Sequence, residues 1–459
     1  MKRIYYIASL VLMLWPCTLT PAAKLNQNDA LPLLSTLYPF DFLNSDVKAS
    51  YAHDITKDIA ERFQLSVNLF TQSTNWANDA DGFRVPTGDV NGRLGLLPMC
   101  YGSVPTGKTE STILTNIAGT AFTFVTANFN ATEYSDPAQY FGFFSVASQY
   151  RKMGTRFQVS GRIFENVVIT LNAGACDMRQ SSTGIIDERL LANVVTMGGS
   201  TAVQTEFSAD TVTLYNVLTR QWKDVMHDIG VNYSDWHALG IEDMSLQFTY
   251  RKNIPVQQEA DDRKWTKFVF IPHLTVIATG AFGEKKNPDI LLSLPFGNNG
   301  HHSLSLMAGL ALAFNETIEV FAEGGITEYA SQNQDLRVPT SIYQSGLYPY
   351  KTRVKVTPSN TYQGTFGLNA HYFIDKLSTF VQVNYAAHEH DSFELLQYDP
   401  AYILSRLETD TEWKYGVVNV GLNYDLSPSI SLGAAAQLPM GNRASYLSNT
   451  FMIGMTGTF

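Results

Sequence analysis

Residues 447–459 read LSNTFMIGMTGTF, and their side chains alternate between two kinds. One set of alternate positions is mostly apolar: Leu447, Asn449, Phe451, Ile453, Met455, Gly457 and Phe459. The positions between them carry small or polar side chains, apart from Met452. Successive side chains of a β-strand point to opposite faces, so this stretch predicts a strand with one apolar and one polar face.

The same alternation recurs upstream in several segments of similar length. It is clearest in 361–373 (TYQGTFGLNAHYF) and in 376–387. Each segment has about ten residues, which is the length that a tilted strand needs to cross a bilayer. The connections between segments are alternately short, as at 374–375, and long and polar, as at 328–360 and 388–410.

The C-terminal strand with its final Phe459 resembles the last strand of bacterial outer-membrane β-barrel proteins. The resemblance implies an all-β fold, a transmembrane antiparallel up-and-down barrel formed by residues 62–459. It also implies location in the bacterial outer membrane, with the membrane lipids around the barrel, the short turns in the periplasm and the long loops outside. An exported soluble β-sandwich would alternate too, but its strands are usually shorter and its inner faces bulkier.

Strict up-and-down order predicts about 14 strands, or about 12 if the two weakest are omitted. The segment 288–296 is then part of an outer loop. The predicted strands are 62–72, 119–131, 139–150, 154–163, 166–176, 242–252, 265–282, 302–314, 316–327, 361–373, 376–387, 411–424, 428–439 and 448–459.

Three segments do not fit the strand pattern. Residues 1–23 have a charged start, a short apolar run and a small-residue end, as in a secretory signal peptide. Residues 24–61 are mixed in character and are expected to lie in the periplasm or to plug the barrel. Apolar residues at helical spacing predict an amphipathic helix at 208–229, in an outer loop.

Composition and one motif bear on nucleotides and nucleic acids. The net charge of −10 argues against nucleic-acid binding, which favours a basic surface. Residues 102–109 read GSVPTGKT and match the phosphate-binding loop pattern, but no buried strand leads into them. We therefore interpret 102–109 as a turn-rich loop and expect no nucleotide.

The alternation also assigns side chains to the barrel interior. Charges there would either set an electrostatic preference for passing solutes or pair with one another and fill the interior. The sequence leaves both interpretations open. The candidate pore-lining residues are Arg156, Arg162, Asp243, Gln247, Arg251, Glu319, Glu323 and His371.

No metal, cofactor or catalytic site is expected. His301-His302 and His388-Glu389-His390-Asp391 fall in predicted outer loops, where a solvated loop is a better interpretation than a metal site. Cys100 and Cys176 allow either a disulfide or two unpaired thiols.

The sequence therefore predicts an outer-membrane channel, not an enzyme, for passive or weakly selective passage of small solutes. Two alternatives stay open: a plugged barrel that transports hydrophobic or specific substrates, and a surface anchor or adhesin that acts through its loops. The pattern does not indicate the transported solute or the oligomeric state.

Overall fold

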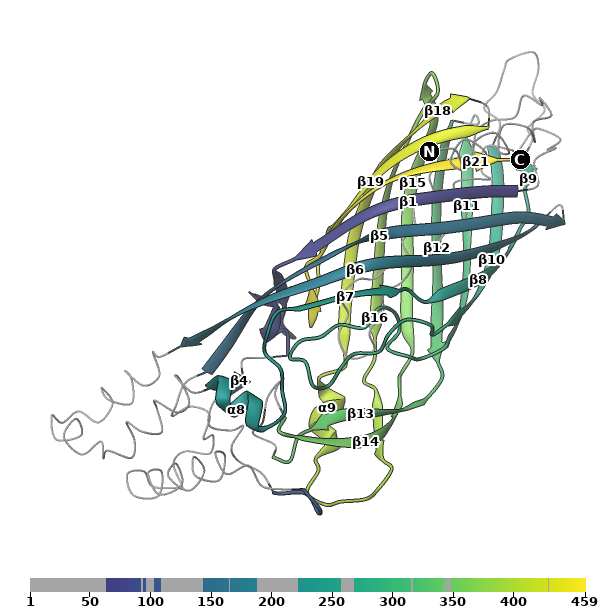
Figure 1. The fold of residues 1–459 in the computed structure, drawn as a ribbon. Coiled ribbons are helices and arrows are strands. Elements are labelled where there is room, and N and C mark those ends of the chain that lie inside the picture. The colour runs from purple at the N-terminus through teal and green to yellow at the C-terminus, as the bar shows by residue number, and fades with distance from the viewer. Residues whose placement is uncertain are drawn as a thin grey trace, which may run out of the picture.

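A computed structural model describes residues 63–91, 94–95, 103–108, 143–164, 166–187, 222–256, 268–314, 317–341, 344, 348–427 and 429–459. Within these residues, 12 antiparallel strands form one closed ring (Figure 1). The ring strands are β1 (Phe63–Thr74), β5 (Phe143–Phe164), β6 (Val167–Asp187), β8 (Met244–Arg251), β10 (Phe268–Gly280), β11 (Ser303–Phe314), β12 (Ile318–Tyr329), β15 (Thr361–Ile374), β16 (Leu377–His388), β18 (Trp413–Ser427), β19 (Ile430–Pro439) and β21 (Asn449–Thr458).

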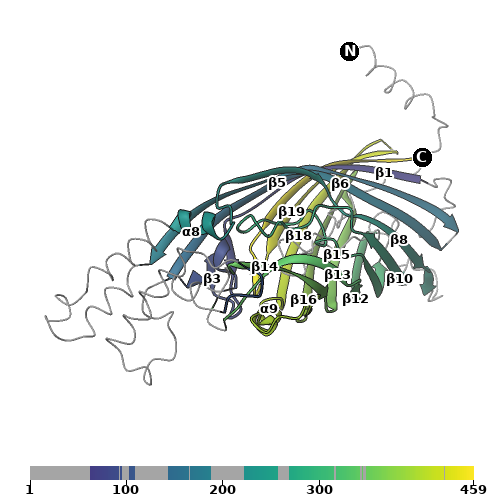
Figure 2. The same cartoon turned by 60° about the horizontal axis from the view of Figure 1, so that its bottom comes forward.

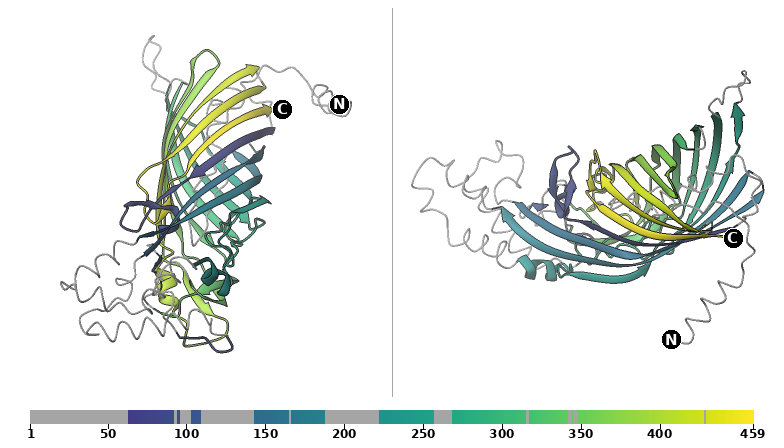
Figure 3. Two further views of the ribbon diagram at one scale, coloured as in Figure 1. Left: turned by 60° about the vertical axis from the view of Figure 1, so that its left-hand side comes forward. Right: turned by 90° about the horizontal axis from the view of Figure 1, so that it is seen from above.

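The ring closes between segments that are far apart in the sequence. The first strand β1 lies between β21 and β5, so the purple strand β1 and the yellow strand β21 lie side by side (Figure 3). Phe63 and Phe459 exchange backbone hydrogen bonds of 3.2 and 2.9 Å at this seam. The pairing of β5 with β6 completes the circle, so every ring strand has a neighbour on each side.

The two faces of the wall differ in the way that the alternation predicts. Along β1, Leu65 and Leu69 are exposed on the outside, whereas Ser66 and Asn68 are fully buried inside. Other ring strands repeat this pattern, for example with Phe366, Leu422 and Ile453 on the outside. A wall of paired backbone with an apolar outer surface is the form that a membrane-spanning sheet must take.

The two ends of the barrel differ in their connections. At one end, here called the short-turn end, β5–β6, β11–β12, β15–β16 and β18–β19 are joined by two or three residues. The opposite end, here called the mouth, carries long loops with their own secondary structure. Figures 1 and 2 show α9 and the β13–β14 hairpin gathered there, away from the C-terminus.

The loops contain short strands and helices, and apart from α8 the sequence interpretation did not assign them. A three-stranded sheet, here called the external sheet, joins β13, β14 and β17, and a second one joins β2, β3 and β20. The bounds are β2 (Trp76–Asn78), β3 (Arg84–Pro86), η2 (Thr87–Asp89), β4 (Leu94–Gly95), α8 (Trp222–Asp228), β7 (Trp236–Ile241), β9 (Ile254–Val256), β13 (Gln332–Val338), β14 (Tyr350–Thr357), β17 (Ser392–Leu395), α9 (Leu404–Thr409) and β20 (Ser445–Tyr446).

The prediction of 14 strands is wrong. The alternative count of 12 is right, but that alternative omits 62–72 and 119–131, whereas 62–72 corresponds to the ring strand β1. The predicted strands 139–150 and 154–163 are one continuous strand, β5, in which Arg151, Lys152 and Met153 continue the alternation. Two consecutive cations resemble a turn in the sequence, but Lys152 points inward to an anionic partner and Arg151 points outward near the mouth. The predicted strand 119–131 lies outside the described residues.

Other predicted segments are described only in part. Of the helix predicted at 208–229, only α8 falls within the described residues, so the full helix stays a prediction. Residues 1–23 and 24–61 lie outside the described residues. No described helix has the length and apolarity needed to cross a membrane.

The lipid-facing assignment predicts a large cost for a charge in the middle of the wall. Leu69→Arg is expected to destabilise the barrel folded in vesicles, lowering its free energy of unfolding by about 2–4 kcal/mol, because lipid cannot solvate the guanidinium. Denaturant titration in vesicles would measure this. The control is Phe83→Arg in a mouth loop, where the side chain is 70% exposed and water would solvate the charge. Equal effects of both substitutions would contradict the assignment.

Candidate functional site: the barrel interior and its mouth

All eight side chains that the alternation assigns to the interior follow the inward-facing positions of their strands. Arg156, Asp243, Gln247, Glu319, Glu323 and His371 are buried, and Arg162 and Arg251 are half-buried. They come from β5, β8, β12, β15 and, for Asp243, from the residues just before β8. Their placement agrees with the sequence pattern, whereas a role in lining a pore remains a prediction.

Interior polar and charged side chains contact one another along the wall. The Arg251 guanidinium is 3.6 Å from the Glu319 carboxylate, and His273 Nε2 is 3.4 Å from Glu323 Oε2. Asn369 Nδ2 donates a hydrogen bond of 3.0 Å to Glu319. These contacts favour the interpretation in which the interior charges largely compensate one another.

A deeply buried cluster of interior charges contains Glu242, which the sequence interpretation missed. The Glu242 carboxylate accepts hydrogen bonds from Arg156, 2.7 Å from Nε and 2.9 Å from Nη2, and forms an ion pair with Lys152. All three side chains are at most 1% exposed. The Arg156 guanidinium also lies 3.9 Å from the centre of the Phe70 ring, a cation–π contact.

A β-bulge explains why alternation did not find Glu242. Ala175 pairs with Ile241 and Asn172 pairs with Ser245, so three residues of one strand face two of β6. The extra residue makes Glu242 and Asp243 both point inward, whereas strict alternation would send one of them outward. Two adjacent acidic residues between apolar strand positions are the signal that could have indicated the bulge.

Glycines on the intervening strands make room for these charge pairs. Gly174 lies beneath the Glu242–Arg156 pair, and a Cβ there would be 2.2 Å from Glu242 Oε2. Gly309 lies beneath the His273–Glu323 pair, and a Cβ there would be 2.6 Å from His273 Nε2. The paired side chains can therefore lie flat against the wall.

The interior also has an apolar patch near the short-turn end, which the sequence interpretation did not predict. It consists of Val269, Ile271, Ala311, Ala313 and Phe321 on β10, β11 and β12. The alanines of β11 are small enough to be either lipid-facing or interior residues, so residue type alone could not assign them to one face of the strand.

Asp243, a candidate pore-lining residue, binds the backbone of a loop at the mouth. Its carboxylate accepts hydrogen bonds from the backbone N–H groups of Gly283, at 2.8 Å, and Asn298, at 2.5 Å. These residues lie near the two ends of the β10–β11 loop, residues 281–302. Asp243 therefore fixes that loop at the mouth, with Gly297 so close that a Cβ there would be 2.2 Å from the carboxylate.

The β10–β11 loop packs against the wall formed by β1, β5 and β6. Its residues Leu294 and Phe296 join an apolar cluster that includes Phe70 and Met178. The Tyr150 hydroxyl donates a hydrogen bond of 2.6 Å to the carbonyl oxygen of Leu292. Residues 293–301 of this loop are buried, so the loop covers part of the mouth.

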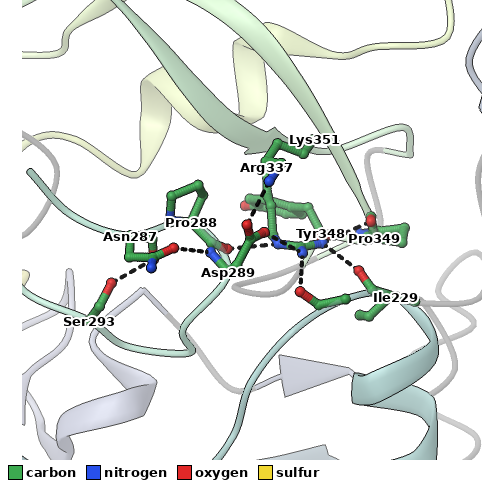
Figure 4. A network of polar contacts seen from close by, with 10 residues as sticks. Ile229, Asn287, Pro288, Asp289, Ser293, Arg337, Tyr348, Pro349 and Lys351 are labelled. Carbon is green, nitrogen blue, oxygen red and sulfur yellow. Dashed lines mark hydrogen bonds and ion pairs between the residues drawn. The ribbon is translucent and has the colours of Figure 1, made fainter. Parts of the chain in front are cut away.

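Arg337 joins the β10–β11 loop to two other mouth segments (Figure 4). Its guanidinium donates hydrogen bonds of 2.8–3.0 Å to the backbone carbonyls of Ile229, Gly230, Pro288 and Pro349. It also pairs with the Asp289 carboxylate at 3.0 Å, and Lys351 pairs with the other carboxylate oxygen at 2.6 Å. We call Arg337, Asp289 and Lys351 the latch.

The described mouth loops leave an open depression of about 620 Å³, lined by residues that include Gly230, Asn232 and Asp289, and a smaller cavity. A cavity of about 90 Å³ lies beside the latch and is lined by residues that include Ile290, Leu336, Tyr348 and Asp410. Burial raises the pKa of the Asp410 carboxyl, which accepts a hydrogen bond of 3.1 Å from the Tyr348 hydroxyl. The described mouth loops therefore pack against one another at the latch, with an open depression beside it.

The histidine-containing segment at 388–391 is not the solvated loop that we expected. His388 is buried, stacks on Trp413, and contacts Asp391 and Thr361 at 2.8 Å each. His390 is exposed and points elsewhere, with its side chain 52% exposed. Across the described residues, no group of three or more potential metal-binding side chains is found.

The remaining sequence candidates are resolved only in part. Lys108 N donates a 3.1 Å hydrogen bond to Pro105 O, so the described part of the phosphate-loop motif is a turn, as expected, and Thr106 N binds the Asp399 carboxylate at 2.7 Å. Gly102 and Thr109 lie outside the described residues. Cys176 is a buried free thiol, and Cys100 lies outside the described residues.

Removal of the Glu242 charge is expected to destabilise the barrel. Glu242→Gln would leave Lys152 and Arg156 buried without their anion, a change that typically costs about 3–5 kcal/mol. Denaturant unfolding in detergent or lipid would measure the loss. Glu328→Gln, at an exposed outward position of β12, is the matched control. A Glu242→Gln barrel as stable as this control would contradict the assigned ion-pair cluster.

Comparisons with known proteins give no close relative. No family model matches the sequence, and no curated protein matches it. Among solved structures, an outer-membrane channel from Pseudomonas putida F1 is 10% identical, with coverage of 88% of this chain and 97% of that one and a TM-score of 0.45.

Two further structural likenesses are more distant in shape. The translocator domain of the autotransporter NalP from Neisseria meningitidis is 9% identical, with 89% and 92% coverage and a TM-score of 0.33. The monoaromatic hydrocarbon channel CymD is 10% identical, with 89% and 93% coverage and a TM-score of 0.29. At these identities and TM-scores, the likenesses assign neither a substrate nor a subfamily to this chain. The chain's own geometry, a closed 12-stranded ring with an apolar outer face, is that of a bacterial outer-membrane β-barrel.

Proposed function

We propose that the protein is an outer-membrane channel for passive, weakly selective passage of small solutes, and that its mouth loops gate it. The observation that carries the proposal is the polar interior of the closed ring, where Arg156 and Arg251 pair with carboxylates along the wall. A self-compensated interior favours exclusion by size over strong selection by charge. The proposal involves no chemical step, no cofactor and no catalytic residue.

The packing of the mouth loops at the latch supports gating as part of this proposal. In the described conformation, the latch connects the β10–β11 loop to the loop containing α8 and to the external sheet. Passage of a solute would require these loops to separate, or to fluctuate on the time scale of loop motion, nanoseconds to microseconds. A closed and an open arrangement of the same loops would thus set the conductance.

Two other functions remain as alternatives, each with its own test. The external sheet has a separate apolar core that includes Leu336, Val354, Val356 and Phe393, which supports a role of the loops in surface binding. Replacement of 328–360 should abolish cell-surface binding if the protein is an adhesin. Deletion of 24–61 should raise the conductance only if that segment plugs the barrel.

The first test is single-channel conductance of the detergent-extracted protein in a planar bilayer. We expect discrete steps of constant size with weak preference between small cations and anions. Steps with strong ion selectivity would contradict the self-compensated interior. A protein that inserts in a heat-modifiable form but never conducts, even after the latch is removed, would contradict the channel and favour the surface role.

Removal of the latch should increase the fraction of time that the channel is open. Arg337→Met removes several charge-assisted hydrogen bonds, and one such bond contributes about 1.5–3 kcal/mol, so we expect at least about a tenfold increase in the open-to-closed ratio. Arg353→Met, an exposed arginine on β14 of the external sheet, is the control and should behave like the wild type. An unchanged open fraction in Arg337→Met would refute gating by the latch.

The latch is also expected to be insensitive to pH in the physiological range. Partial burial alone would raise the pKa of the Asp289 carboxyl, but the hydrogen bond and charge of Lys351 and the charge of Arg337 outweigh it and hold this pKa below 3.8. A lowered carboxyl pKa means that the stabilisation is present above the ordinary pKa and is lost as the pH falls through the lowered value.

Conductance recordings at different pH values test this. The difference in open fraction between wild type and Asp289→Asn should be constant from about pH 5 to 8 and should shrink only below about pH 3.8. A difference that disappears already near pH 6 would show that Asp289 is not held ionised by the latch.

A further inference from the structure

A row of three basic or potentially basic side chains lies on the outer face of the wall, facing away from the interior. Arg151 on β5 pairs in register with Arg179 on β6, and Arg179 pairs with His237 on β7. All three point outward, and the Arg179 and His237 side chains are 62% and 60% exposed. We call these residues the outer basic row.

The position of the outer basic row relative to the apolar belt is defined by the strand register. The next row toward the short-turn end is Met153, Asp177 and Leu239, and the one after it is Thr155, Ala175 and Ile241. Leu239 and Ile241 are 76% and 47% exposed, and the outward residues beyond them, such as Phe157 and Leu171, are apolar. The row therefore lies at the border between the apolar belt and the polar mouth.

Two acidic residues, Asp177 and Asp235, lie beside the row, but of the two only Asp177 contacts it. Asp177 binds both Arg179, at 3.0 Å, and His237. Among the described residues, the side chain of Arg151 has no hydrogen-bond or ion-pair partner. Two arginines directly opposite each other on neighbouring strands repel, so this arrangement favours an anion between them.

Space for a head group is present beside the row. A depression of about 570 Å³ is lined by Gln149, Arg151, Arg179, Asp235, Trp236 and His237. The depression lies on the mouth side of the row, because its lining also includes Ser181, which pairs with Gln149 one row further toward the mouth.

We propose that the outer basic row binds the phosphate of an anionic lipid head group in the leaflet next to the mouth. The fork-shaped guanidinium groups of Arg151 and Arg179 match phosphate oxygens in geometry and charge. A lipid is favoured over a free anion because Leu239 and Ile241, one and two rows away, can contact its acyl chains while the phosphate meets the arginines. The inference rests on the outer-membrane location of the barrel but not on its conducting activity.

The test uses the full chain in detergent and measures bound lipid by native mass spectrometry. The probes are a bisphosphorylated glycolipid, the same glycolipid without its phosphates, and inorganic phosphate. The variants are Arg151→Gln and Arg151→Gln/Arg179→Gln, with Arg353→Gln on β14 as the control for loss of a mouth charge elsewhere. Arg151 makes no contact that the fold requires, so a heat-modifiable barrel should be retained.

We expect the bisphosphorylated lipid to bind the wild type and Arg353→Gln equally. Its affinity should fall about tenfold in Arg151→Gln and further in the double variant, because each arginine contributes a charge-assisted hydrogen bond. Removal of the lipid phosphates should have an effect of the same size, and the conductance of Arg151→Gln should equal that of the wild type. A silent wild-type channel would contradict the proposed function while leaving this inference standing.

Three results would overturn the inference. Undiminished lipid binding by the double variant would show that the row is not the site. Equal binding of the dephosphorylated glycolipid would exclude phosphate recognition. Displacement of the lipid by inorganic phosphate at comparable concentration would identify a site for a free anion and refute the lipid assignment.

Discussion

Every structural feature of this protein depends on one constraint, which is that backbone N–H and C=O groups inside a bilayer must be paired with one another. The chain satisfies it by ring closure, and the reciprocal hydrogen bonds between Phe63 and Phe459 are part of the seam. Once the ring is closed, alternation along each strand decides which side chains face lipid and which face the interior. The apolar belt and the polar interior are two consequences of the same pairing.

The β-bulge at Glu242 and Asp243 is the place where the wall departs from that regularity, and the mouth depends on it. One inserted residue turns two carboxylates inward. Glu242 compensates the buried cations Lys152 and Arg156, and Asp243 holds the β10–β11 loop by backbone hydrogen bonds. The position of the loop that covers the mouth is thus determined by an irregularity in the wall beneath it.

The sequence predicted those parts of the structure that follow from local alternation. The strands β15, β16, β18 and β21 and the orientation of Arg156 or Glu319 follow from period-two patterns alone. Lys152 was missed because the prediction breaks the strand at 151–153, and Glu242 was missed because its inward position depends on the β-bulge. Their ion pair, between residues 90 positions apart, could not be predicted from alternation. The external sheet and the latch were missed for the same reason, since they consist of contacts between different loops. The alternation says which face a residue occupies but not which residue it meets.

The seam between β1 and β21 also has a consequence for how the protein is made. The strand that must accept β1 follows all the other described strands in the sequence, so the ring cannot close until those strands have been synthesised. Contacts between such distant segments are slow to form, because a long loop of chain must first be brought together. Until then, the apolar faces of the strands have no membrane and no partner, and the chain is prone to aggregate. The pairing that completes the barrel is therefore also the step that ends this exposure.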